Sequence, residues 1–177
     1  ILADYKSENV WIATYDKGLF RTRAGQTRSY YQSQSLPEKT ITLLFRSKTD
    51  IFLAVSQNRV YQHNPKSDQF ERVGFEFDLG EIQPVIYSFA EAYNGDILIG
   101  TKDHGLFIWA RSAQLENQFA LQPTIESGGL TSSTIYGIEV DSNANLWCST
   151  QNGIVKLDSK GRLIKRFTAA DGLQGND

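Results

Sequence analysis

The stretch that decides the fold is Asn145–Thr150, Asn-Leu-Trp-Cys-Ser-Thr, because three similar stretches occur earlier in the chain. Each reads as one Asx residue, three apolar residues, one small residue and one β-branched residue. The earlier copies are Asn9–Thr14, Asp50–Val55 and Asp96–Thr101. Successive copies begin 41, 46 and 49 residues apart. A period of roughly 40 to 50 residues is the length of one four-stranded propeller blade.

The segments around these copies repeat as well. Tyr15–Phe20 matches Lys102–Phe107, and Gln151–Val155 is the same hairpin one residue shorter. Glycine supplies the positive φ that a tight hairpin needs. The second copy has Arg59 where the others have glycine, so we expect a less regular hairpin there. An apolar strand precedes each of the last three copies, and a more polar strand follows the hairpin. Each repeat therefore contains four strands, which we call inner, second, third and outer.

These repeats predict an all-β fold, a β-propeller of four four-stranded blades that is a fragment of a larger one. The inner and second strands are apolar on both faces, which is typical of sheets lying between neighbouring sheets. The charged outer strands suit exposed edges. A β-sandwich would also have short strands, but it would not repeat one signature four times. The predicted blades span about 1–32, 33–75, 76–121 and 122–169, and residues 170–177 begin the next linker.

The composition narrows the classes of function. The 177 residues carry 18 basic and 20 acidic side chains, a net charge of −2, and nucleic-acid binding needs a basic surface instead. The lone cysteine, Cys148, excludes an intrachain disulfide. No apolar run is long enough for a transmembrane helix. The chain opens Ile-Leu-Ala and contains no methionine, so we expect it to be a piece of a longer protein.

Few residues suggest chemistry of their own. The two histidines, His63 and His104, stand in no metal-binding motif, so we expect no metal and no cofactor. Asp141–Asn145 begins like a calcium loop but lacks the glycine and the glutamate that such loops require. Cys148 occupies an apolar slot and is expected to be an inert core thiol.

Two slots of the repeat predict packing. The small residues Ala13, Ala54, Gly100 and Ser149 share one slot, where a small side chain lets the neighbouring sheet approach closely. Trp11 and Trp147 share another slot and should both be buried.

The last repeat resembles a known family. Asn145–Asp158 and Asp171–Asn176 are similar to the two-component regulator propeller repeat and to its interblade linker. The resemblance extends over all four repeats and is weakest in the second. It implies a seven-bladed parent propeller in the extracytoplasmic, periplasmic sensor region of an inner-membrane bacterial receptor. A transmembrane helix and a histidine kinase or diguanylate cyclase would lie elsewhere in the parent chain.

In a propeller, the hairpins between second and third strands open on the same face as the linkers between blades, and such loops commonly carry function. The polar and charged residues expected on this face predict hydrogen bonding to a small molecule or to a polyhydroxylated ligand such as an oligosaccharide. The candidate ligand-binding residues are Tyr15, Asp16, Lys17, Lys102, Asp103, His104, Gln151, Asn152, Ser132 and Ser133.

The leading hypothesis is therefore a non-catalytic, ligand-sensing and dimerising module, for which self-association is expected. The alternatives are a propeller enzyme of the streptogramin-lyase type and a protein-interaction scaffold. A lyase needs acid and base groups gathered at the mouth of the propeller, where only Asp16, Glu38, Asp103 and His104 could serve. A scaffold of the WD-repeat kind lacks its Trp-Asp and Gly-His pairs here.

Overall fold

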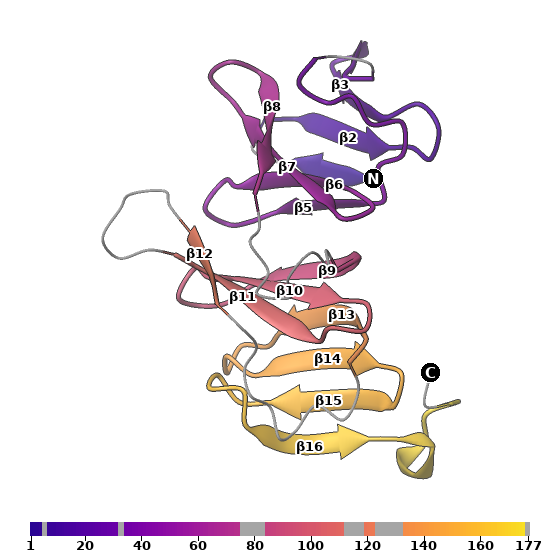
Figure 1. The fold of residues 1–177 in the computed structure, drawn as a ribbon, viewed down its shortest axis with the longest axis vertical. Helices are drawn as coiled ribbons and strands as arrows, with labels where there is room; N and C mark the ends of the chain where they lie inside the picture. Colours follow the sequence, from indigo (N-terminus) through magenta and orange to yellow (C-terminus); the bar gives the residue numbers. More distant parts are fainter. Residues whose placement is uncertain (5–6, 32–33, 75–83, 112–118, 123–132, 176–177) are drawn as a thin grey trace. The chain divides into compact units, whose positions relative to one another are not determined.

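A computed structural model describes residues 1–4, 7–31, 34–74, 84–111, 119–122 and 133–175. The described residues form four antiparallel sheets of four strands each, with neighbouring strands in sequence order, so the all-β prediction is confirmed (Figure 1). The first two sheets are β1 (Leu2–Asp4), β2 (Asn9–Ala13), β3 (Leu19–Arg23) and β4 (Gln26–Ser29), then β5 (Leu43–Arg46), β6 (Phe52–Ser56), β7 (Arg59–Asn64) and β8 (Gln69–Val73). The other two are β9 (Ile86–Glu91), β10 (Ile97–Thr101), β11 (Leu106–Arg111) and β12 (Phe119–Gln122), then β13 (Ile135–Val140), β14 (Leu146–Thr150), β15 (Gly153–Leu157) and β16 (Leu163–Phe167).

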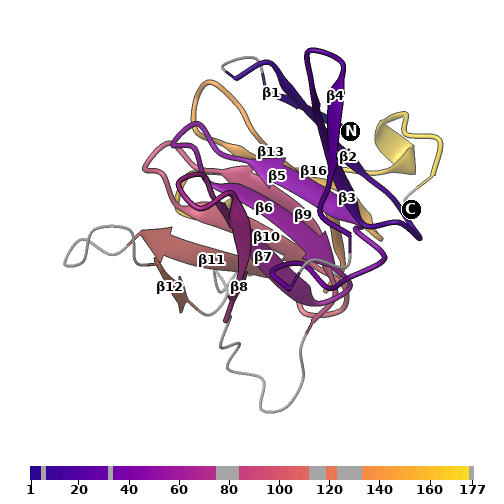
Figure 2. The same cartoon turned by 90° about the horizontal axis from the view of Figure 1, so that it is seen from above.

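The chain divides into two compact units, and each contains two of the sheets (Figures 1 and 2). Unit 1, Ile1–Gly74, holds β1 to β8, and unit 2, Phe75–Asp177, holds β9 to β16 and the single helical turn η1 (Ala169–Asp171). The second strands β6 and β10 are buried along their whole length, as expected of strands covered on both faces.

The core of unit 1 is aromatic. The Trp11 indole lies with its ring centroid 4.5 Å from that of Phe52 and 5.5 Å from that of Tyr30. Phe70 meets both Trp11 and Tyr30 edge to face, the geometry that ring quadrupoles favour. Because these residues come from β2, β6 and β8 and from the residue after β4, their packing joins the two sheets.

The cluster that joins the two sheets of unit 2 is aliphatic, although Phe89, Phe107 and Trp109 are buried elsewhere in that unit. Leu98 and Leu106 from the third sheet pack with Ile138, Leu146 and Leu157 from the fourth. The inner strands β9 and β13 lie beside each other at this interface. Burial of branched aliphatic side chains contributes about 1.5–3 kcal/mol each, so this core needs no aromatic ring to hold its sheets together.

The second repeat lies one residue later than predicted. In three sheets a backbone N–H closes the turn before the second strand by donating to the first residue of the repeat, and these acceptors are Ile51, Asp96 and Asn145. Asp50 instead has a φ of 66° and takes the turn position of Gly95. The aligned copy is therefore Ile51–Ser56. A shift of one residue moves every side chain of a strand to the other face.

This shift changes the predicted small-residue slot. Ala54 aligns with Cys148, and Val55 takes the slot of Gly100, so the prediction is wrong for the second repeat. It is confirmed at Gly100, where an added Cβ would come within 3.1 Å of the carbonyl oxygen of Ile135 on the neighbouring sheet. The missing side chain thus lets β13 approach β10 closely.

The two equivalent tryptophans differ in burial. Trp11 is only 2% exposed, as predicted, whereas Trp147 is half-buried. The indole of Trp147 stacks on Phe167 and lies under the Lys156 ammonium, and its N–H donates to Asp141. The prediction that both tryptophans are buried is therefore wrong for Trp147. These contacts of its indole come from a few side chains of its own sheet, and they leave part of the ring exposed.

Candidate functional site

The hairpins between second and third strands lie against the segments that lead into the next sheet, as the repeat pattern predicts. In unit 1, the Gly18 amide donates to the Lys39 carbonyl oxygen and the Ile41 amide donates to that of Thr14. In unit 2, the Gly105 amide donates to the Ser133 carbonyl oxygen at 2.5 Å. Both units therefore carry an edge at which a hairpin and a linker meet, and we call it the hairpin edge.

The threonine that ends the repeat signature closes these hairpins. The hydroxyls of Thr14, Thr101 and Thr150 donate to the carbonyl oxygens of Gly18, Gly105 and Gly153 at 2.7–2.9 Å. In the second repeat, Ser56 takes this place and reaches Glu38 instead, while the hairpin turns through Gln57 at a φ of 58°. This hairpin therefore differs from the other three, which confirms the prediction that it is less regular.

The hairpin edge of unit 2 combines charged and polar groups. The Asp103 carboxylate accepts a hydrogen bond from the Thr134 hydroxyl at 3.0 Å, which ties the hairpin to the linker. His104 places Nδ1 2.9 Å from the Lys102 carbonyl oxygen. Because a carbonyl only accepts, Nδ1 is the donor of this hydrogen bond.

The predicted ligand-binding residues fall into separate groups. Lys102, Asp103, His104 and Ser133 are brought together at the hairpin edge of unit 2, and Gln151 and Asn152 are exposed on the β14–β15 hairpin at the same end of that unit (Figure 1). The exposed Tyr15, Asp16 and Lys17 form the hairpin tip of unit 1. Ser132 lies outside the described residues. Each unit therefore has its own part of the predicted face.

Glu38, one of the possible acid–base groups, is engaged in a polar network in unit 1. Its carboxylate accepts hydrogen bonds from Arg59 at 2.6 Å and from the Tyr61 hydroxyl at 2.9 Å. Burial opposes ionisation, but these hydrogen bonds outweigh it and lower the pKa of Glu38. A carboxylate held ionised in this way is a poor general acid.

A second network, which sequence reasoning missed, surrounds Asp68 in unit 1. Its carboxylate accepts two parallel hydrogen bonds from Arg21 at 2.7 and 2.9 Å, and others from Tyr30 and His63. Arg28 adds a further contact. Burial opposes the effect, yet the bonds from His63, Tyr30 and Arg21 lower the pKa of Asp68 to about 2. The network joins the first sheet to the turn between β7 and β8, and its role is structural.

His63 belongs to this network. Its side chain is 10% exposed and packs against Trp11 and Phe70, and burial lowers its pKa. Among the residues that the structure describes, no three His, Cys, Asp or Glu side chains are grouped so as to hold a metal ion.

The calcium-like turn and the cysteine have structural explanations. The Asp141 carboxylate accepts from the amides of Asn143 and Asn145 and from the Trp147 indole, and these hydrogen bonds lower its pKa. Its oxygens are thus used within its own sheet. Cys148 is fully buried, and burial raises the pKa of its thiol to about 12, as expected for an inert core residue.

The structure adds two tyrosines that the sequence-based prediction did not include. Tyr87 on β9 and Tyr136 on β13 are 36% and 45% exposed, and their rings stack with centroids 5.7 Å apart. A sequence signal was present, since each follows an isoleucine and precedes a small residue, Ser88 or Gly137.

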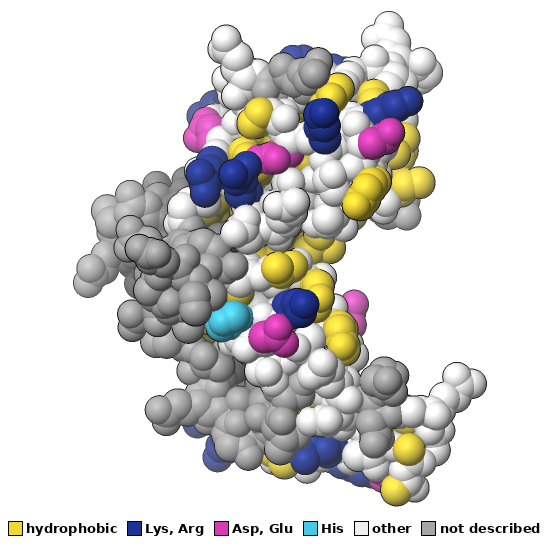
Figure 3. Space-filling view, turned by 45° about the vertical axis from the view of Figure 1, so that its right-hand side comes forward, with side chains coloured by type: hydrophobic (Ala, Val, Ile, Leu, Met, Phe, Trp, Pro, Cys, Tyr) yellow, Lys and Arg dark blue, Asp and Glu magenta, His cyan; other side chains and the backbone are white. Residues whose placement is uncertain are grey.

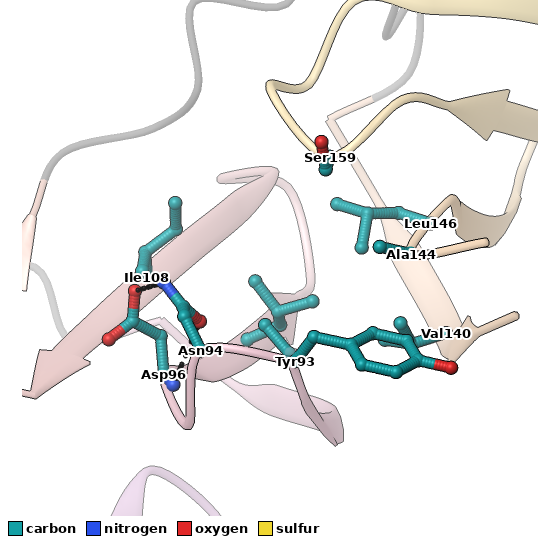
Figure 4. A pocket seen from close by; sticks show the side chains of 10 residues that line it. Tyr93, Asn94, Asp96, Ile108, Val140, Ala144, Leu146 and Ser159 are labelled. Carbon is teal, nitrogen blue, oxygen red and sulfur yellow. Dashed lines mark hydrogen bonds between the residues drawn. The ribbon is translucent and has the colours of Figure 1, made fainter. Parts of the chain in front are cut away.

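Unit 2 also contains a cavity of about 240 Å³ at the opposite ends of its strands (Figure 4). Figure 4 shows the ring of Tyr93 near Val140, with Leu146 on the facing sheet. The polar groups Asn94 and Asp96 are bonded to each other at 2.6 Å. The lining is mainly apolar, so the groups that a polyhydroxylated ligand requires lie at the hairpin edge instead.

The surface charge is mixed. Figure 3 shows basic and acidic side chains lying close to one another and interspersed with hydrophobic ones on the face drawn. Within the described part of the chain, no helix has the length and apolar character needed to span a bilayer.

No protein-family model matches the chain. Among curated proteins it is similar to histidine kinase P4 of Formosa agariphila, with 25% identity over 179 residues. The match covers 95% of this chain and 13% of that protein, so the chain spans about one eighth of its curated relative.

Solved structures share the fold. The extracellular domain of the putative hybrid two-component system BT3049 from B. thetaiotaomicron matches with a TM-score of 0.79 and 19% identity, over 98% of this chain and 23% of that one. Virginiamycin B lyase from Staphylococcus aureus matches with a TM-score of 0.63 and 17% identity, over 94% and 54%. The chain is therefore similar to a segment of histidine kinase P4 and shares its fold with part of the extracellular domain of BT3049.

Proposed function

We propose that this chain is a ligand-sensing module of a bacterial transmembrane receptor and binds an oligosaccharide at its hairpin edges. The output would be a histidine kinase, or a diguanylate cyclase, elsewhere in the parent protein. The observation that carries the proposal is the hairpin edge of unit 2, where Lys102, Asp103 and His104 meet Ser133. These side chains offer hydrogen-bond donors and acceptors, and they include a positively and a negatively charged group. Such groups bind the hydroxyls of a sugar.

The relatives support this choice over an enzyme. The curated relative is a histidine kinase, and a similar solved structure is the extracellular domain of a putative hybrid two-component system. We therefore also propose that the chain lies on the periplasmic side of a receptor that crosses the inner membrane. The likenesses to BT3049 and to the lyase, at 19% and 17% identity, each speak for the fold alone, so the choice between sensor and enzyme rests on the histidine kinase.

Self-association belongs to the same proposal, because a receptor can report binding through a change in dimer geometry. The edge strand β16 exposes Leu163 and Ile164 next to the charged Lys165, and the backbone groups at a sheet edge can pair with a strand of another chain. Sedimentation velocity of the whole chain should show a concentration-dependent dimer, and Ile164→Lys should weaken it. A monomer at every concentration would contradict this part.

A glycan array tests ligand binding directly. The chain should retain at least one oligosaccharide, and titration calorimetry with that sugar should show weaker binding for Lys102→Ala and His104→Ala. Lys160→Ala, an exposed lysine on the β15–β16 turn at the far end of the strands, serves as the matched control. An array without any retained glycan, or hairpin variants that bind like the unchanged chain, would reject the proposal.

A further inference from the structure

The inner strands of unit 2 share one irregularity. On β9, Ile86 pairs with Thr101 and Ser88 pairs with Gly100, so Tyr87 between them has no partner. On β13, Ile135 pairs with Thr150 and Gly137 with Ser149, which leaves Tyr136 unpaired in the same way. A β-bulge of this kind turns its extra residue out of the regular alternation, and bulges are frequent beside functional sites.

The close approach of the two sheets brings the bulges together. Gly100 leaves room for the backbone of Ile135, which is the residue before Tyr136. The two tyrosine rings therefore lie nearly parallel, at 23°, and each keeps a substantial part of its surface in solvent. Large aromatic surface that stays exposed on paired inner strands is available to a ligand at little cost in conformational entropy.

The tyrosine pair is adjacent to the hairpin edge. The Lys102 amide donates to the carbonyl oxygen of Val85, two residues before Tyr87. Thr134, which binds Asp103, lies two residues before Tyr136. Two residues of strand span about 7 Å, roughly the width of a sugar ring and its hydroxyls.

We propose that Tyr87 and Tyr136 form a ring-stacking subsite that selects the sugar ring bound at the hairpin edge of unit 2. This inference rests on the oligosaccharide-binding function proposed above. A hexopyranose with equatorial hydroxyls has an apolar face of C–H groups, which packs on the tyrosine rings, while its hydroxyls reach Asp103 and Lys102. A sugar with an axial hydroxyl on that face would present a polar group to the rings and bind less well.

The chain itself supplies a conservative replacement. Val55 takes the slot of Gly100, and their partners on the inner strands are Leu43 and Ser88. The residue before Leu43, Thr42, therefore holds in the second sheet the position that Tyr87 holds in the third. Thr42 is exposed there, and threonine, being β-branched, suits extended backbone. Threonine at Tyr87 or Tyr136 should therefore remove the rings and keep the bulge.

The experiment compares Tyr87→Thr, Tyr136→Thr and the double variant by calorimetry with the oligosaccharide retained on the array. The double variant should bind about tenfold more weakly, and Tyr→Phe at either position should bind nearly as well as the unchanged chain. Tyr93→Thr, which removes a more exposed tyrosine (63%) at the other end of the strands, is the control and should bind normally. Saturation-transfer NMR with methyl β-D-glucopyranoside should mark its ring C–H protons, and methyl β-D-galactopyranoside should give a weaker signal.

The outcomes separate the two proposals. If the unchanged chain binds the oligosaccharide and the double variant binds it equally well, the stacking subsite is wrong and the sensor function stands. If Tyr93→Thr weakens binding as much as the double variant, the effect is not specific to the stacked pair and the inference also fails. If the unchanged chain binds no glycan, the proposed function fails and the inference with it.

Discussion

Units 1 and 2 join their sheets by different chemistry. In unit 1 the interface holds Trp11, Tyr30 and Phe70, and the Asp68 carboxylate binds two arginines at its edge. In unit 2 the interface holds leucine, isoleucine and valine, with Cys148 among them. The same four-stranded repeat supports both, because packing requires filled volume and satisfied polar groups rather than particular residue types.

One turn position shows this difference residue by residue. Asp4 and Asp141 both precede the second strand of their sheets by the same number of residues. Asp141 accepts from amides of its own turn and from the Trp147 indole. Asp4 is buried, accepts from the Ser7 hydroxyl of its own turn and also pairs with Arg46 of the neighbouring sheet at 2.5 Å. An aspartate at a repeat position can thus serve its own turn alone or also join two sheets, and the partner in space decides which.

The largest effect should come from Trp11→Ala in unit 1. Removing a fully buried indole from among Tyr30, Phe52 and Phe70 should lower the free energy of unfolding by about 3–5 kcal/mol. Trp147→Ala should cost clearly less, because that side chain is half-buried. Urea unfolding followed by far-UV circular dichroism measures both, and labelling of Cys148 by a thiol reagent reports separately on unit 2. Equal losses for the two variants would remove the contrast between the units.

Gly100→Ala should have the next largest effect and lower the free energy of unfolding by about 2–3 kcal/mol. The added Cβ would clash with the Ser88 hydroxyl on β9 and would meet the side chain and the carbonyl oxygen of Ile135 at 2.9 and 3.1 Å. The serine side chain can rotate, but backbone on the facing sheet cannot move away cheaply. Gly74→Ala, where nothing lies within 4 Å of the new atom, is the control and should be nearly neutral. A neutral Gly100→Ala would show that β13 does not approach β10 closely.

Asp68→Asn should lower the free energy of unfolding by about 1–2 kcal/mol, since it weakens charge-assisted bonds in a partly exposed network. Asp158→Asn in unit 2 loses an ion pair to the exposed Arg162 and should change stability little. Thermal unfolding compares the two variants. A greater loss for Asp158→Asn would contradict the structural role assigned to Asp68.

The smallest effect is a dependence on pH. The pKa of Asp68 is about 2 in the folded chain, below the value of about 3.9 for an unfolded aspartate. A carboxyl whose pKa is lowered by folding stabilises the fold above the unfolded value, and that stabilisation is lost as the pH falls from about 4 to about 2. The difference in unfolding free energy between the unchanged chain and Asp68→Asn should therefore shrink over this window. A constant difference would show that the carboxylate contributes nothing as an anion.

The repeat signature was sufficient to predict four sheets of four strands, the order of the strands and the hairpins. It failed at the second repeat, where Asp50 looked like the Asx of the other copies but occupies the turn before them. Sequence similarity could not detect this shift, because Ile51, Phe52 and Leu53 are all apolar and fit either register. The hydrogen bond from Ser47 to Ile51 decides it.

The sequence by itself determined the local chemistry of the hairpin edge, since the turn residues and their threonine caps bind partners only a few positions away. Only the tertiary structure revealed that Asp68 gathers Arg21 and His63, and that Tyr87 and Tyr136 meet. These contacts join residues more than 40 apart, except for the short His63–Asp68 step, and depend on how one sheet lies on the next. Period and composition describe what a strand contains, and packing between strands distant in the chain decides what its side chains touch.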